Sequence, residues 1–337
     1  MNKNYNFKSA KYELATDIVV AANTYAGVLA LPYLAPSVKL AETVAKGFVT
    51  ELDGITKAAV VNTLTPGTLI KTAACGWDND TDLVLGESVL SVTDMMVNEQ
   101  VCRATIYPTW VAASMRGRNG DIPADFADFL LSTVANKTAE EVEDRIWVGG
   151  AAPTFAGFLS NDGVFDRAGL AAGQMAIAGG VNGQAITSIT AANVVAGLGL
   201  VYAKANANCS GILGKADTQI LVNQKTFGFY AQALGEAGSA QGVRMEGTNQ
   251  GFNTLQYLGI PVNVCPGMPD DAIIMCQASN LFYGTNLGTD TNEAKLIPFY
   301  NYDGSDNVGI SMRFAIGVQI GVASDIVLGT TEAILPA

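Results

Sequence analysis

Residues 141–150 read EVEDRIWVGG and close the strongest helical pattern of the chain. Apolar side chains recur near the helical period in and before this segment, on a stripe made of Phe126, Leu130, Val134, Val142 and Ile146. Two consecutive glycines, Gly149 and Gly150, stop the pattern, because glycine disfavours a helix interior and is common just past a helix end.

The start of the same helix is marked by Asp121 and Pro123. An aspartate can accept a hydrogen bond from a free N–H of the first turn, and a proline there has no N–H to leave unpaired. The sequence therefore predicts a helix over residues 121–148, about 42 Å long at ~1.5 Å per residue. We expect two pairs of neighbouring charged residues to face solvent: Glu140 and Glu141, and Asp144 and Arg145.

Strand patterns lie on both sides of this helix. Residues 1–50 resemble an arm with little core of its own, and Ile55 to Trp110 has the pattern of a long, hairpin-like excursion with a turn signal at Pro66-Gly67. Near the C-terminus, one strand face is formed by Val308, Ile310, Met312, Phe314, Ile316 and Val318. We expect Val134 to be buried against that strand.

The middle of the chain predicts two shorter helices and several short strands. Thr190 is expected to cap the first of these helices, and Asn223 to open the second directly after a buried strand over residues 219–222. Further strands are expected over residues 257–262 and 273–276. Together the patterns indicate the α+β class.

Composition excludes several functions. The chain of 337 residues has no histidine, which excludes Ser-His-Asp and Cys-His catalysis and the common zinc and haem sites that use imidazole. Its net charge of −12 argues against a nucleic-acid reader and against docking on anionic membrane. Charged residues are only 15%, so either other subunits cover much of the surface or uncharged polar residues supply it.

The cysteines indicate free thiols. They number five and form no CxxC pair: Cys75, Cys102, Cys209, Cys265 and Cys276. An odd number without dense spacing favours buried thiols in a reducing compartment over a disulfide framework. We find neither a signal-peptide pattern nor an apolar run long enough to span a membrane, so we expect a cytoplasmic site of synthesis and use.

No motif predicts catalytic, cofactor-binding or metal-binding residues. Residues 211–216 lack the spacing and the Ser or Thr of a phosphate-binding loop. Asp78, Asp80 and Asp82 alternate like the start of a calcium loop but lack its glycine and its final glutamate. No local pattern singles out a pair of carboxylates for acid–base chemistry.

The order of these parts resembles a tailed-phage major capsid protein of the Hong Kong 97 type. The helix that ends in Gly149-Gly150 and leads to Pro153 and Gly157 is similar to that family's junction after its spine helix. The later matches are a strand followed by Asn223 and a helix, the segment around Gly259 and Pro261, and the last long strand with Arg313. Each match is weak alone, whereas their order covers nearly the whole chain.

The resemblance implies a fold with an N-terminal arm, an extended β loop, a spine helix, and peripheral and axial domains. By this likeness the parts would be the arm over 1–54, the extended loop over 55–112, the spine helix and start of the peripheral domain over 113–184, the axial domain over 185–262, and the return strands of the peripheral domain with the C-terminal end over 263–337. The structural candidates are Lys71, Asp121, Pro123, Phe126, Leu130, Val134, Trp147, Gly149, Gly150, Gly259, Pro261 and Arg313.

The function that the resemblance implies is self-assembly into hexamers and pentamers of an icosahedral shell around double-stranded DNA, in a virion assembled in the host bacterial cytoplasm. The implied partners are other copies, a portal, a separate scaffolding protein and decoration proteins, with no cofactor and no membrane. Some family members cross-link a loop lysine to an asparagine. Lys71 lies in the corresponding loop, but no partner asparagine or glutamate aligns with it.

Three other functions stay open from the sequence. An encapsulin-type bacterial compartment shell would share the fold and enclose a cargo enzyme. A secreted surface-layer or fibre protein would also be acidic and rich in Gly and Thr, although the long helix counts against it. An enzyme would need an active site without imidazole.

Overall fold

The structure, a computed structural model, describes residues 23–26, 41–66, 75, 83–102, 126–151, 154–160, 165, 174–177, 180–186, 188–236, 255–287, 293–299, 305 and 307–330. Within these ranges the chain forms a six-stranded sheet, a seven-stranded sheet, two two-stranded ribbons and the helices between them. This combination confirms the predicted α+β class.

The six-stranded sheet is built around one long strand. Its members are β1 (Asn23–Ala26), β15 (Glu293–Pro298), β16 (Asn307–Ile320), β14 (Leu281–Thr285), β2 (Thr50–Leu52) and β5 (Thr93–Cys102), of which β15, β14 and β5 all pair with β16. The strand predicted over 308–318 is thus confirmed and slightly longer. Five of its predicted inward residues are buried, and Val318 is half-buried, because successive strand residues face opposite sides of a sheet.

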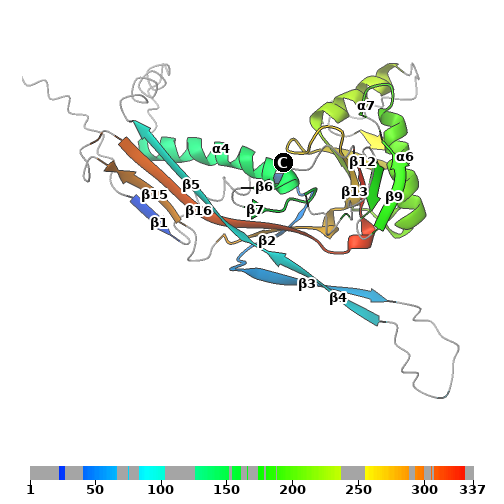
Figure 1. Cartoon of the computed structure of the whole chain (residues 1–337), viewed down its shortest axis with the longest axis horizontal. Helices are drawn as coiled ribbons and strands as arrows, with labels where there is room; N and C mark the ends of the chain where they lie inside the picture. The colour runs from blue at the N-terminus through cyan, green and yellow to red at the C-terminus, as the bar shows by residue number, and fades with distance from the viewer. Residues whose placement is uncertain are drawn as a thin grey trace, which may run out of the picture.

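The long helix α4 (Phe126–Val148) lies along this sheet (Figure 1). It ends where the sequence predicts, and residues 121–125 of the predicted helix, with Asp121 and Pro123, lie outside the described residues. Figure 1 also places the seven-stranded sheet at the Val148 end of the helix.

The buried stripe of α4 differs from the predicted one. Its fully buried apolar residues are Leu131, Ala135, Val142, Ile146 and Trp147, whereas Val134 is half-buried and packs at the margin of the core. At about 100° per residue, Leu131 and Val142 point in nearly the same direction, but Val134 is turned from Val142 by about 80°. Residues spaced by four do not stay on one face, because each step of four turns about 40° beyond a full rotation of the helix. Val134 is therefore not at the centre of the buried face, contrary to our expectation.

The seven-stranded sheet is a wall between two hydrophobic cores. Its order is β11 (Gln256–Tyr257), β12 (Ile260–Val264), β10 (Thr218–Val222), β13 (Ile273–Gln277), β17 (Val327–Gly329), β8 (Gln174–Ile177) and β9 (Gly180–Ala185). Leu221 and Ile274 join the core under α4, while their neighbours Ile220 and Ile273 join the second core. Every residue of β10 and β13 is buried for this reason.

Two helices, α6 (Val194–Asn208) and α7 (Gln224–Glu236), cover the outer face of this wall. The predicted cap is wrong by three residues: Asn193 is the N-cap residue of α6, and Thr190 begins the turn before it. The Asn193 Oδ1 atom accepts a hydrogen bond from the Thr190 N–H at 2.7 Å, which holds this turn outside the helix. Among the described residues, further short elements are β6 (Gly150–Ala151), β7 (Thr154–Phe155) and the 3₁₀ turns at Ser210–Ile212, Ala278–Asn280 and Ala323–Asp325.

The end of the predicted arm is part of the main core. Ala41, Val44 and Val49 are buried there, and the short helix α2 (Glu42–Ala45) and β2 belong to the same segment. Our expectation of little core within the arm is therefore wrong for residues 41–54. The sequence pattern conceals this, because the segment buries single residues from a turn, a one-turn helix and a short strand.

The predicted excursion divides into two parts. Strands β3 (Ala58–Pro66) and β4 (Leu83–Ser91) pair in full antiparallel register and project from the body as a ribbon (Figure 1). Strand β5 instead pairs along β16, from Thr93 opposite Ile316 to Cys102 opposite Asn307. The turn signal at Pro66-Gly67 coincides with the end of β3, and residues 67–74 and 76–82 lie outside the described residues.

Candidate functional site: a projecting ribbon rooted on the core

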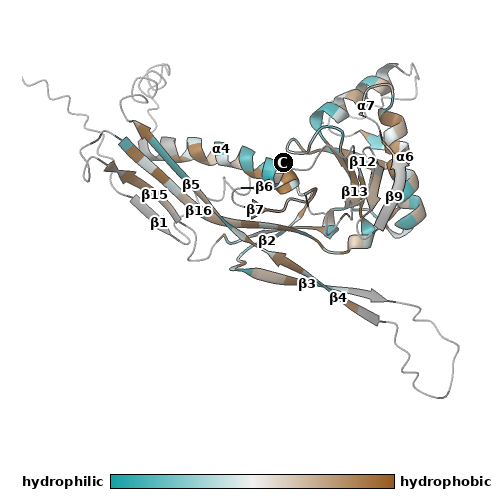
Figure 2. Cartoon of the chain, in the orientation of Figure 1, coloured by the Kyte–Doolittle hydropathy of each residue, from teal (hydrophilic) through white to brown (hydrophobic). Residues whose placement is uncertain are grey.

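One face of the β3–β4 ribbon exposes three large apolar side chains beside the polar Asn62 and Glu87. Val60 and Val89 are paired across the ribbon and are 54% and 53% exposed, and Leu85, on the same face, is 63% exposed. Figure 2 colours much of this ribbon as hydrophobic. Exposed apolar residues that share one face of a projecting element are typical of an interaction surface.

The ribbon is rooted by close backbone contacts. Leu90 at its base is fully buried, and the Ser88 hydroxyl donates to the Gly321 carbonyl at 2.8 Å. Beneath the base, Gly284 of β14 and Gly317 of β16 are paired across the sheet. A Cβ atom at Gly317 would overlap the Ser91 carbonyl, and one at Gly284 would press on Leu90, so this glycine pair lets the ribbon cross the sheet in contact with it.

The end of α4 is capped by the chain that follows it. The Phe158 N–H donates to the Ile146 carbonyl and the Leu159 N–H to the Trp147 carbonyl, both at 2.9 Å. These bonds satisfy carbonyls that a helix end otherwise leaves unpaired. Gly149 makes the reversal possible, since its φ is +79° and a Cβ atom there would overlap the Phe155 carbonyl.

A buried hydrogen-bond network joins α4 to the segment before β2. Glu143 is only 5% exposed, and its carboxylate accepts from the Thr43 N–H at 3.0 Å and from the Thr43 hydroxyl at 2.5 Å. The Trp147 indole N–H donates to the same hydroxyl oxygen at 3.0 Å. The buried carboxylate thus accepts hydrogen bonds on both oxygens, which offsets part of the cost of burying it.

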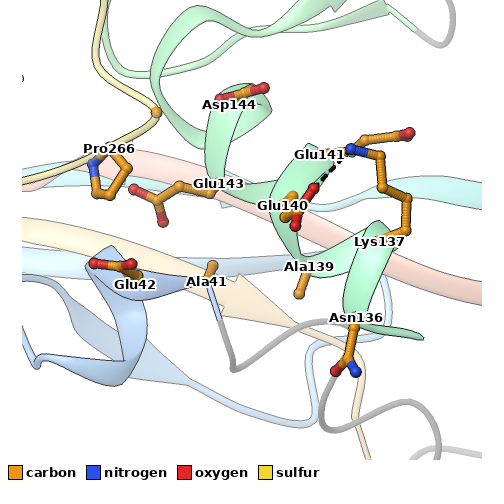
Figure 3. Close-up of a pocket in the computed structure, with 11 residues that line it drawn as sticks. Ala41, Glu42, Asn136, Lys137, Ala139, Glu140, Glu141, Glu143, Asp144 and Pro266 are labelled. Carbon is orange, nitrogen blue, oxygen red and sulfur yellow. Dashed lines mark hydrogen bonds and ion pairs between the residues drawn. The ribbon is translucent and has the colours of Figure 1, made fainter. Parts of the chain in front are cut away.

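An open groove lies beside this network, between α2, α4 and the turn after β12. Acidic residues dominate its lining: Glu42, Glu140, Glu141, Glu143 and Asp144. Figure 3 shows Glu143 extending from α4 toward the side of the groove that carries Ala41, Glu42 and Pro266. Lys137 and Glu140 form an exposed ion pair at 2.6 Å. Glu140, Glu141 and Asp144 are exposed as expected, whereas Arg145 is half-buried, so that expectation is wrong for Arg145. Burial and the nearby Glu140 and Glu141 raise the pKa of Asp144, although Lys137 opposes them.

The predicted structural residues are placed as follows. Trp147 is buried and packs on Phe158 with ring centroids 5.4 Å apart, and Gly149 and Gly150 carry the chain out of the helix. Gly259, with a φ of +83°, forms the turn before Pro261 in β12. Arg313 is exposed on β16, opposite Met96 of β5. Lys71 lies outside the described residues, as do the side chains of Phe126 and Leu130.

Sequence reasoning missed Thr43, Glu143 and the exposed ribbon face. Glu143 lies one turn before Trp147 and next to Val142, so it shares a helix face with a large apolar residue. This position was the one signal in the sequence that Glu143 could be buried. Thr43 had no such signal, because its partner lies 100 residues away.

The cysteines divide by position. Cys209, Cys265 and Cys276 are buried and free, as predicted, whereas Cys75 and Cys102 are free and exposed, which contradicts the expectation for those two. Burial raises the pKa of Cys209, with a smaller effect of the nearby Asp325, from its ordinary value of 9.0 to about 11. Burial also raises the pKa of Cys265 and Cys276.

The fold is expected to lose stability between about pH 9 and 11. The pKa of each buried thiol is higher in the folded than in the unfolded chain. The thiol therefore contributes fully to the free energy of unfolding below its unfolded pKa, and this contribution is lost as the pH rises toward its folded pKa. Each thiol can contribute a slope of up to ~1.4 kcal/mol per pH unit. Denaturant unfolding from pH 8 to 11 measures the slope. Cys209→Ala should flatten it, and Cys102→Ser should not; equal slopes in all three proteins would contradict the burial of Cys209.

Two sheets, a long helix along one of them and a projecting two-stranded ribbon are the features by which the fold can be compared with known structures. No protein-family model and no curated protein matches the chain. Solved structures do. The capsid of the native GTA particle matches with a TM-score of 0.52 at 15% identity, over 86% of this chain and 88% of that chain. The empty GTA particle capsid has a TM-score of 0.50 at 15% identity, over the same 86% and 88%.

The satellite phage P4 procapsid, solved with its size determination (Sid) protein, matches with a TM-score of 0.50 at 10% identity, over 89% of this chain and 90% of that chain. At these identities the likeness is one of fold. It confirms the fold that the sequence resemblance implied.

Proposed function

We propose that the chain is the major capsid protein of a tailed phage, which self-assembles into the icosahedral shell around double-stranded DNA. The observation that carries this proposal is the β3–β4 ribbon, whose Val60, Leu85 and Val89 are exposed on one face although its base is firmly rooted. In a chain with the capsid fold, such a face is best explained by a second copy of the chain that covers it.

The parts of the chain take the following roles in this proposal. The six-stranded sheet with α4 forms the peripheral domain, and the seven-stranded sheet with α6 and α7 forms the axial domain. The strands after residue 262 serve both domains, since β13 and β17 lie in the seven-stranded sheet while β14, β15 and β16 lie in the six-stranded one. In this proposal the axial domain extends beyond the range 185–262, because β8, β9, β13 and β17 belong to its sheet.

The proposed partners are other copies of the chain in hexamers and pentamers, a portal and a separate scaffolding protein. Packaged DNA is enclosed without sequence specificity, which agrees with the net charge of −12, because a tight DNA binder would carry a basic surface. The shell forms in the host bacterial cytoplasm and acts by assembly rather than by catalysis. In the described part of the chain, no helix is long and apolar enough to cross a membrane.

Sedimentation of the purified chain tests the proposal. We expect capsomers or shells rather than a single species at the chain mass of 35.1 kDa. Nuclease-protected DNA inside particles from infected cells would separate a phage shell from a compartment that holds a cargo enzyme. A monomer over all salt and protein concentrations would contradict the proposal.

A further inference from the structure

Residues 41–55, here called the strap, cross the junction of the two sheets. At one end Thr43 is held by Glu143 and Trp147 of α4. At the other end the Ile55 N–H donates to the Thr285 carbonyl at 2.9 Å, and the Thr285 hydroxyl donates to the Asp53 carboxylate at 2.8 Å. Between these ends, β2 pairs in parallel with β14.

The middle of the strap is bound to the seven-stranded sheet. The side-chain amide of Gln219, on β10, donates to the Phe48 carbonyl at 2.8 Å. Its oxygen accepts from the Asn263 side chain on β12 at 3.0 Å. Gln219 is itself buried, so loss of the Phe48 contact would leave a buried polar group without that partner.

These contacts are connected in series through the strap. The Phe48 N–H donates to the Thr43 carbonyl at 3.2 Å. Thr43, which is bound to α4, is therefore also bound to Phe48, which contacts β10. A continuous line of hydrogen bonds therefore runs from Trp147 and Glu143 through Thr43 and Phe48 to Gln219. The buried Val44 and Val49 lie on the same segment and join the core shared by α4 and the inner face of the seven-stranded sheet.

We infer that the strap is a single cooperative lock that fixes the seven-stranded sheet against helix α4, and that it opens as one unit when its contact with α4 or its contact with β10 is lost. Independent contacts would open separately. Because the lock bridges the two halves of the subunit, it sets the angle between them before any copies meet.

Hydrogen exchange of the purified full chain tests this inference without reference to assembly. Thr43→Val removes the hydroxyl and keeps the side-chain shape. We expect the amide protection of residues 50–55 to fall by about tenfold, together with that of residues 44–47, because loss of the two hydrogen bonds of the Thr43 hydroxyl opens the whole unit. Thr43→Ser keeps a hydroxyl and should restore protection in both segments.

Gln219→Met tests the same inference from the side of β10, because it removes the contact with Phe48. It also tests the inference if Thr43→Val does not fold. It releases the middle of the strap, and we expect protection to fall at residues 44–47 near α4. The matched control is Glu42→Gln, which removes the exposed ion pair with Lys46 from the same segment and should leave exchange unchanged. Loss of protection confined to the residues next to the lost contact, in either variant, would overturn the single unit.

A second measurement rests on the proposed function. If the lock sets the angle between the two halves, Thr43→Val particles should vary in diameter in electron micrographs, whereas Thr43→Ser and Glu42→Gln particles should be uniform. Uniform Thr43→Val particles would overturn the role of the lock in shell geometry. If no variant assembled, but protection of residues 44–47 and 50–55 still fell together in Thr43→Val, the result would count against the capsid function and would support the lock.

Discussion

Val89→Asp is expected to abolish shell assembly while leaving the isolated subunit folded. Val89 is 53% exposed on a projecting ribbon, so the substitution should change the free energy of unfolding by less than about 0.5 kcal/mol. In a shell the same position would be covered, and burial of an unpaired carboxylate costs several kcal/mol at each copy. The assembled fraction, measured by sedimentation, should fall at least about tenfold, since about 1.4 kcal/mol already changes an equilibrium by that factor.

Two control variants separate this effect from general damage to the ribbon. Val89→Ile keeps an apolar residue on the exposed face and should assemble. Glu87→Gln changes the charge of a neighbouring exposed residue on the same face of β4 and should also assemble. Normal assembly of Val89→Asp would show that the apolar face is not an interface.

Gly149→Ala is expected to have the largest effect on the stability of the subunit. A left-handed φ of +79° costs an alanine about 1–2 kcal/mol, and overlap with the Phe155 carbonyl adds about 1–3 kcal/mol of overpacking. The second cost cannot be relieved by a side-chain rotation, because the obstructing atom belongs to the backbone. The chain should be mostly insoluble, or unfold at much lower denaturant concentration.

Gly214→Ala is the matched control, since Gly214 has a similar φ of +86° and a Cβ atom there would meet no other atom within 4 Å. It should lose only the conformational part, about 1–2 kcal/mol. Denaturant unfolding of the two variants therefore isolates the close packing at the end of α4. Equal losses would contradict the tight reversal between Gly149 and Phe155.

Elements with a clear period were predictable from the sequence. The end of α4 combines a regular apolar pattern with the stop signal of Gly149-Gly150, β16 shows a clear alternation of apolar residues, and the strand before Asn223 is a short apolar run. The ribbon was recognisable as an excursion for the same reason. Its apolar face was not, because β-branched residues favour strands whether or not the folded subunit covers them.

The strap could not be predicted, for a physical reason. Its contacts join Thr43 to Glu143 and Phe48 to Gln219, and no local pattern encodes pairs so far apart in the chain. Residues 41–55 also change conformation every few positions, so no period develops. The buried stripe of α4 was predicted with a smaller error. Residues spaced by four from Phe126 turn gradually away from the face that is buried in the structure.

Electron cryomicroscopy of the assembled chain would show directly whether the ribbon is an interface between copies. We expect closed icosahedral particles in which the β3–β4 ribbon of each copy lies on a neighbouring copy, with Val60, Leu85 and Val89 covered. A map in which the ribbon extends into solvent in a closed shell would contradict the assigned interface. Particles without icosahedral symmetry, or no particles under conditions in which the subunit is folded, would contradict the function itself.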